Sequence, residues 1–256
     1  MLEYSIYPFD YMRITQRHDE GNHLPHWNPF KGCSDKPFDE ATEDGGRGYF
    51  VPKNNYKVVE KLGSQTSGYS VRLETAYKVK IPLKDEAVIV EITLTHLNYD
   101  DWSKLYKGQI IHKNEKIIRE GTSGQASGNH LHCTANIGKY YGFKKNGNGK
   151  WCFVYEKSLT PEEAFYVDSS VKILNAKGYN FKQVPFLPAR GWFTKGDSGT
   201  NVEKIDLWFA DKVKGNYYGD YSVAVVKEFQ RQNGLEQDGN IGEKTLSKME
   251  EQGFKE

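Results

Sequence analysis

The spacing of apolar residues changes once along this chain, and that change constrains the fold more than any other feature. In the first 155 residues, short runs rich in β-branched and aromatic residues alternate between apolar and polar positions, which predicts strands. The clearest predicted strands are residues 56–59, 69–77 and 87–95. After Gly191, apolar residues recur every three to four positions, which predicts amphipathic helices at residues 202–213 and 222–233 and a last helix near 243–251. We therefore expect a mainly antiparallel β domain followed by a small three-helix bundle.

The segment between these two parts has its own character. Thr160 and Pro161, with two acids after them, are typical of a helix start, and Pro185 and Pro188 disfavour regular structure further on. We predict a β domain over residues 1–155, a connector over 156–190 and a helical domain over 191–256.

Charge and cysteine usage exclude two classes of protein. The chain has 35 basic and 34 acidic residues, a net charge of +1, so it lacks the basic field that draws proteins onto nucleic acid. Its cysteines, Cys33, Cys133 and Cys152, form no CxxC pair and are odd in number, which disfavours a disulfide framework and a thiolate zinc site. We expect reduced thiols.

The N-terminus gives an expectation about location. The first ten residues lack the basic end and apolar run of a secretory signal, and no stretch of 18 apolar residues occurs. We expect a chain made in a host cytoplasm without a signal peptide and without membrane insertion. If its substrate lies outside the membrane, it acts only after release.

Histidines carry the most informative pattern. In His130-Leu131-His132, alternation on a strand places both imidazoles on one face and Leu131 in the core. His96 lies upstream, and Asp39 supplies an acidic candidate. A catalytic zinc ion needs about three nitrogen or oxygen ligands and one open position, which two histidines and an aspartate would provide.

Four stretches in one order then resemble the lysostaphin-like zinc endopeptidases, which cleave peptide bonds in bacterial peptidoglycan. The matching stretches are residues 96–97, 106–111, 120–124 and 128–132. The resemblance implies that His132 and Asp39 are zinc ligands and that the third ligand is a histidine upstream of Asp39. It also implies that His96 and His130 are catalytic histidines that do not bind zinc.

The identity of the upstream ligand stays open between two residues. His23 and His26 both precede Asp39 at a longer distance than in the best-known members, so an inserted loop is required. We favour His23, with His26 as the alternative, because the stretch from Ile14 to His23 is similar to the family's approach to this ligand. His18 and His112 are expected on the surface.

The same insertion is similar to endolysins of phages that infect Gram-positive bacteria. The resemblance lies in residues 22–26, 39–41 and 44–47. It implies a viral lysis enzyme, which agrees with the expected absence of a signal peptide.

The C-terminal residues resemble a three-helix peptidoglycan-binding domain. The resemblance lies in residues 195–202, 224–235 and 238–246, where glycines suit helix ends and Phe229, Leu235 and Leu246 suit a core. No acid, base or nucleophile set stands out there, so we expect a wall-binding module. Trp208, Tyr217 and Tyr218 are candidates for stacking on sugars, although Trp208 also suits the core.

Two rival functions remain at this stage. One is a non-catalytic wall-binding or activator protein that has lost hydrolase activity. The other is a glycosidase that uses paired carboxylates such as Asp39 and Glu40.

Overall fold

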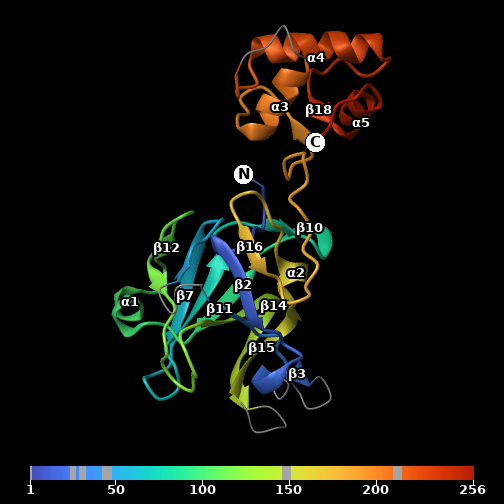
Figure 1. Ribbon diagram of the computed structural model, residues 1–256. Coiled ribbons are helices and arrows are strands. Elements are labelled where there is room, and N and C mark those ends of the chain that lie inside the picture. Colours follow the sequence, from blue (N-terminus) through green and yellow to red (C-terminus); the bar gives the residue numbers. More distant parts are fainter. Residues whose placement is uncertain (1, 24–26, 29–32, 42–47, 146–150, 210–214) are drawn as a thin grey trace. The chain divides into compact units, whose positions relative to one another are not determined.

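The computed structural model describes residues 2–23, 27–28, 33–41, 48–145, 151–209 and 215–256 of the chain. It divides into two compact units, Met1–Val184 and Pro185–Glu256. The first unit is built mainly from strands and the second mainly from helices (Figure 1).

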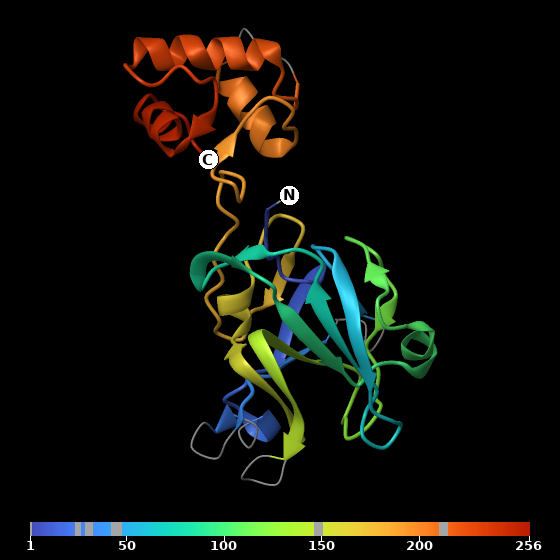
Figure 2. The same cartoon turned by 180° about the vertical axis from the view of Figure 1, so that it is seen from behind.

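One large sheet organises the first unit. Among the described residues it has nine strands. In spatial order these are β12 (Ile110–Ile111), β7 (Tyr56–Leu62), β8 (Ser70–Thr75), β11 (Glu91–Thr95), β14 (Leu131–Lys145), β5 (Phe38–Glu40), β2 (Tyr11–Gln16) and β16 (Lys172–Asn175), with β15 (Trp151–Leu159) also paired to β14. All pairs are antiparallel except β16 with β2. Figure 2 shows the long β14–β15 hairpin from behind.

Shorter elements surround this sheet. A three-stranded sheet contains β1 (Glu3–Tyr4), β9 (Val79–Ile81) and β10 (Lys84–Val88), and two further pairs join β6 (Tyr49–Phe50) to β13 (Ile118–Arg119) and β3 (Trp27–Asn28) to β4 (Cys33–Ser34). The short helices are η1 (Gly21–His23), α1 (Tyr99–Lys104) and α2 (Pro161–Ala164). Thr160 donates its backbone N–H to the Glu163 side chain at 2.8 Å, which confirms the predicted helix start.

The alternation predicted for β14 is present. Leu131, Cys133 and Ala135 are buried in the core of the first unit, so the residues between them, including His132, project to the other face. The buried thiol of Cys133 is therefore a core group and not a second ligand beside His132. This strand fixes the face on which a site can form.

The strand expected within residues 69–77 is present as β8, but its two faces do not divide into a buried and an exposed one. Val71 and Leu73 are buried as expected, but Arg72 on the opposite face is also only 6% exposed. The hairpin explains this burial, because Tyr140 from β14 lies under the guanidinium at 3.5 Å and Tyr155 from β15 accepts a hydrogen bond from Arg72 Nε at 3.1 Å. Both faces of β8 are thus covered.

The first unit extends past the predicted boundary at residue 155. That residue lies inside β15, and β16 then adds a parallel strand to β2. Phe165, Val167 and Tyr179 are buried in the core of this unit. Residues 156–184, predicted as a connector, are therefore part of the β unit because their apolar side chains complete its core.

The second unit contains the three expected helices. They are α3 (Thr200–Trp208), α4 (Asp220–Gln232) and α5 (Glu243–Glu251), beside a pair formed by β17 (Trp192–Phe193) and β18 (Ile241–Gly242). Phe229 and Leu246 are in its core, and Trp208 packs against that core. Tyr217 is exposed, whereas Tyr218 is buried and donates its hydroxyl to the Gly239 carbonyl at 3.0 Å, so Tyr218 is not a sugar-stacking surface. The predicted β domain followed by a three-helix unit is confirmed.

Two further observations concern the cysteines and membrane-spanning helices. Cys133 and Cys152 are buried free thiols, and the side chain of Cys33 lies outside the described residues. Within the described ranges, no helix has both the length and the apolar character needed to cross a membrane.

Candidate metal centre

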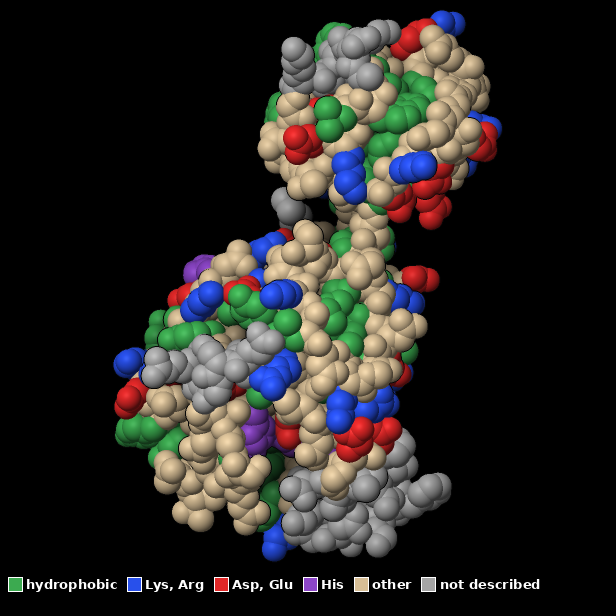
Figure 3. Space-filling view, in the orientation of Figure 1, with side chains coloured by type: hydrophobic (Ala, Val, Ile, Leu, Met, Phe, Trp, Pro, Cys, Tyr) green, Lys and Arg blue, Asp and Glu red, His purple; other side chains and the backbone are tan. Residues whose placement is uncertain are grey.

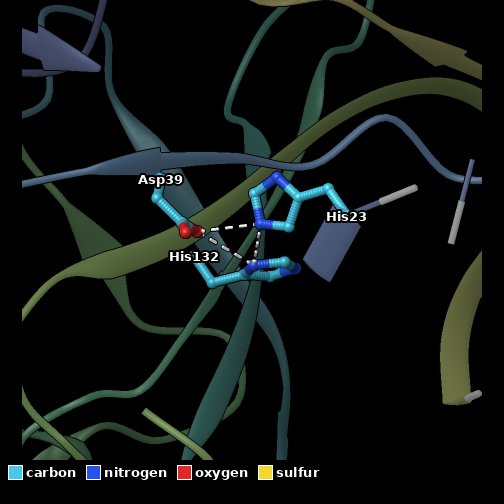
Figure 4. Close-up of side chains that lie close together, drawn as sticks. All are labelled: His23, Asp39 and His132. Atoms are coloured by element: carbon cyan, nitrogen blue, oxygen red, sulfur yellow. Dashed lines mark hydrogen bonds and ion pairs between the residues drawn. The ribbon is translucent and has the colours of Figure 1, made fainter. Parts of the chain in front are cut away.

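Three elements bring His23, Asp39 and His132 together. Asp39 on β5 and His132 on β14 are direct partners across two antiparallel strands, so their side chains lie next to each other. His23 comes from η1, the turn that follows β2. Figure 4 shows the three side chains converging from these elements.

The three donor atoms form an almost equilateral triangle. His23 Nε2 lies 3.2 Å from Asp39 Oδ1 and 3.2 Å from His132 Nδ1, and His132 Nδ1 lies 3.1 Å from Asp39 Oδ1. Within the described part of the chain, this is the group of histidine, cysteine and acidic residues arranged as metal ligands. The structure thus brings together the residues predicted as ligands.

A backbone carbonyl sets the orientation of the His23 ring. His23 Nδ1 lies 2.8 Å from the Arg17 carbonyl oxygen. Because that oxygen can only accept, Nδ1 carries the proton and Nε2 keeps its lone pair, which faces Asp39 and His132. A metal ion requires this unprotonated nitrogen.

The charge of Asp39 is also set by its neighbours. Asp39 is 8% exposed, and burial alone would raise its pKa. The neighbouring imidazoles of His132 and His23 outweigh burial and hold the pKa of this carboxyl well below its usual value. The site therefore offers one carboxylate and two imidazoles.

These donors fit zinc. Two ligands bound at the usual zinc distances and a tetrahedral angle lie about 3.3–3.6 Å apart, within a few tenths of an ångström of the separations here. Two nitrogens and one oxygen are a common donor set of catalytic zinc sites, and the hydrogen bond from His23 Nδ1 to a carbonyl is the usual support of a ligand histidine.

His96 lies beside this triangle in a constrained conformation. It follows β11 directly and has φ of 69°, which is uncommon for a residue other than glycine. Its Nδ1 donates to the Ser123 carbonyl oxygen at 2.7 Å, which leaves Nε2 unprotonated. Burial, with a smaller contribution from the charge of His132, lowers the pKa of His96 to about 4, so the ring is neutral at pH 7.

His130 is the second histidine next to the triangle. Its ring centroid lies 4.7 Å from that of His96, and its Nε2 lies 3.7 Å from Asp39 Oδ1. Its Nδ1 donates to the Gly128 carbonyl oxygen at 2.8 Å. His130 itself is half-buried. Figure 3 shows histidine side chains beside acidic side chains at the surface of the first unit.

Sequence reasoning did not assign the residue that positions His96. Ser123 accepts the backbone N–H of Tyr69 at 2.9 Å and donates to the Leu97 carbonyl at 3.0 Å through one hydroxyl. Gly121 permits the close approach, since a Cβ there would lie 2.7 Å from the His96 carbonyl oxygen. The Gly-Thr-Ser-Gly pattern at residues 121–124 was the available signal.

Asp39 and Glu40 do not form a carboxylate pair. They are adjacent on β5, so their side chains project from opposite faces. Glu40 is buried, accepts hydrogen bonds from the Tyr7 hydroxyl and the Arg13 backbone N–H, and burial raises its pKa to about 8. A glycosidase needs two carboxyl groups facing one bond, and these two do not.

The remaining histidine predictions have different outcomes. His112 is exposed, as expected. His18, expected on the surface, is buried against Tyr179, a contact with a residue far away in the sequence. His26, the alternative to His23, lies outside the described residues.

Comparison with known families agrees with the C-terminal prediction. Residues 206–249 match a family described as "Putative peptidoglycan binding domain". No curated protein matches the chain.

Several solved structures match part of the chain. A zinc-containing peptidase from Vibrio cholerae is 18% identical with a TM-score of 0.36, and the match covers 63% of this chain and 39% of that one. LytU is 19% identical with a TM-score of 0.36, covering 59% of this chain and 82% of that one. The catalytic domain of lysostaphin from Staphylococcus simulans is 16% identical with a TM-score of 0.30, and the match covers 59% of this chain and 88% of that one. The chain thus spans well under half the length of the Vibrio cholerae peptidase.

Proposed function

We propose that this chain is a zinc-dependent endopeptidase that hydrolyses peptide bonds in bacterial peptidoglycan. The observation that carries the proposal is the triangle of His23 Nε2, Asp39 Oδ1 and His132 Nδ1, with sides of 3.1–3.2 Å. A zinc ion held by these three atoms would polarise the peptide carbonyl and lower the pKa of a water molecule toward neutrality.

His96 is proposed as the residue that accepts a proton from the attacking water. Its Nδ1 is occupied by the Ser123 carbonyl, so the proton is taken up at Nε2. The lowered pKa of His96 keeps the ring in the accepting, neutral form at pH 7. A low pKa makes His96 a weaker base, and the fixed orientation of its ring would offset this weakness.

His130 is proposed to act on the carbonyl oxygen of the scissile bond. With Nδ1 donating to Gly128, a proton on Nε2 would allow His130 to donate toward the negative charge that develops on that oxygen. The ring centroids of His130 and His96 lie 4.7 Å apart, which supports a shared role of the two side chains at one reacting group.

The C-terminal unit is proposed to hold the enzyme on the wall. The family match at residues 206–249 supports binding to peptidoglycan. Linking a binding unit to a catalytic unit raises the local concentration of substrate without new catalytic contacts. A fragment of residues 185–256 should sediment with purified walls, and its removal should reduce lysis at low enzyme concentration.

We further propose that the enzyme is a phage-type endolysin, made in the host cytoplasm and released to the wall during lysis. The support is the long separation of 16 residues between His23 and Asp39, which is similar to such endolysins. Expression inside a Gram-positive host should be harmless until a membrane pore is formed, and rapid lysis should then follow.

The central experiment is digestion of purified Gram-positive walls. Digestion should stop with a chelator, return with zinc, and release new amino groups but no reducing sugar. The His132→Ala variant should be inactive, whereas the matched His112→Ala variant at an exposed position should be active. Metal-free digestion at the full rate would contradict the proposal, and so would binding of walls without any cleavage, which marks a non-catalytic protein.

A further inference from the structure

A turn from the segment expected to be a connector lies against the approach to the metal centre. β16 runs beside β2, as Figure 1 shows, and the chain turns immediately after it, at residues 176–179. After β2 ends at Gln16, the backbone continues through Arg17 and His18 to His23 in η1. The end of the first unit therefore meets the segment from which one proposed ligand comes.

Arg17 makes two contacts with this turn. Its guanidinium carbon lies 4.3 Å from the centre of the Tyr179 ring, and its Nη1 donates to the Lys177 carbonyl at 3.2 Å. Lys177 has φ of 50° and Gly178 has φ of 79°, so the turn has a conformation that fits few sequences. The contacts of Arg17 thus join two parts of the chain about 160 residues apart.

His18 makes the third contact. The Tyr179 hydroxyl lies 2.8 Å from His18 Nδ1, and the two rings are stacked with centroids 6.1 Å apart. Tyr179 is 5% exposed and His18 is 7% exposed. Leaving a buried polar group without a hydrogen-bond partner costs about 1–3 kcal/mol of free energy, so the contact between Tyr179 and His18 resists separation.

These contacts hold the backbone that orients His23. The Arg17 carbonyl oxygen accepts the proton of His23 Nδ1, and the Glu20 carbonyl oxygen accepts the backbone N–H of His23. Lys177 also reaches Glu20, with Nζ 3.5 Å from Oε2. The turn therefore contacts Arg17 and Glu20, the two residues whose carbonyl oxygens accept the hydrogen bonds from His23.

We propose that Tyr179 is a positioning residue of the metal centre, which holds Arg17 and His18 so that His23 presents Nε2 to the metal. This inference rests on the proposed metal site. Loss of partners of ligand histidines lowers metal affinity by about 10- to 100-fold, and Tyr179 acts one step further away. We expect about a ten-fold loss of zinc affinity when its ring is removed.

Two variants test this role in the full chain. Tyr179→Leu removes the ring under Arg17 and the hydroxyl at His18, and Tyr179→Phe removes only the hydroxyl. Zinc affinity is measured by competition with a chelator, and nitrogen NMR of the metal-free protein reports which ring nitrogen of His23 carries the proton. Tyr179→Leu should weaken zinc binding about ten-fold and mix the two ring forms of His23. Tyr179→Phe should have the same effects to a smaller degree.

A control separates positioning from general destabilisation. Ile81→Ala removes a buried side chain from the separate β1–β9–β10 sheet. It should lower thermal stability at least as much as Tyr179→Phe but leave zinc affinity and the His23 ring form unchanged.

Two results would overturn the proposal. One is a Tyr179→Leu protein with wild-type zinc affinity and a single His23 ring form. The other is an equal loss of zinc affinity in Ile81→Ala. If the wild-type chain takes up no zinc, the proposed function fails instead, and the NMR measurement on metal-free protein still decides the role of Tyr179.

Discussion

The ring of His96 is held by the main chain of Ser123, whose carbonyl oxygen lies 2.7 Å from His96 Nδ1. The side chain of Ser123 in turn links Tyr69 to Leu97, the residue after His96. One serine thus fixes both the ring nitrogen and the backbone of a residue with positive φ. The reactive nitrogen of His96 has a defined direction because of these three hydrogen bonds.

Replacing Ser123 by Ala should therefore impair catalysis more than metal binding. The variant leaves the Tyr69 N–H and the buried Leu97 carbonyl without this partner, so His96 should shift. We expect the rate of wall digestion to fall on the order of ten- to a hundred-fold, since small displacements of a catalytic group are costly. Zinc content should remain at one ion per chain. The exposed neighbour Thr122→Ala is the control and should digest walls normally.

The adjacent residues Asp39 and Glu40 provide a matched pair of carboxyl variants. Asp39→Asn should lose zinc, because an amide is a far weaker ligand than the carboxylate held by His23 and His132. Glu40→Gln should keep zinc and activity, because burial raises the pKa of Glu40 to about 8 and the side chain is already neutral at pH 7. Metal analysis and wall digestion check both variants. A glycosidase with paired carboxylates would instead be inactivated by either change.

The sequence predicted the part of the site that is local. His130 and His132 share a strand face because side chains alternate along β14, and that alternation is visible in the residues themselves. Asp39, the partner of His132 across the sheet, was assigned as a ligand only through the family resemblance. The residues of two distant strands do not by themselves determine the register in which the strands pair.

The sequence left the choice between His23 and His26 as the upstream ligand open, and there is a physical reason for this. η1 is a short turn whose place depends on Arg17 and His18, and these residues are held by Tyr179. A contact across about 160 residues leaves no periodic signal near the histidines. The burial of Arg72 was missed in the same way, because its aromatic partners lie on the distant β14–β15 hairpin.

The division of the chain can be tested by truncation. A fragment of residues 1–184 should fold cooperatively, whereas a fragment of residues 1–155 should not. The shorter fragment lacks buried core residues that include Phe165, Val167 and Tyr179. Losing one buried aromatic costs about 3–5 kcal/mol, so losing several removes most of the usual 5–15 kcal/mol of stability. Circular dichroism melting curves check this, and a sharp transition in residues 1–155 would restore the earlier boundary.

The stability of the C-terminal unit should fall as pH rises through about 6. Asp206 on α3 is buried, and burial raises the pKa of its carboxyl to about 6, while the Ser222 hydroxyl 3.4 Å away offsets burial only in part. A carboxyl whose folded pKa is raised contributes stability that is complete below its unfolded pKa, near 3.8, and is lost as pH rises through the folded value. Unfolding of residues 185–256 in denaturant should show a loss of about 1–3 kcal/mol between pH 4 and pH 7. The Asp206→Asn side chain does not titrate, so the free energy of unfolding of this variant should not change between pH 4 and pH 7. An equal decline in the variant would show that another group causes the effect.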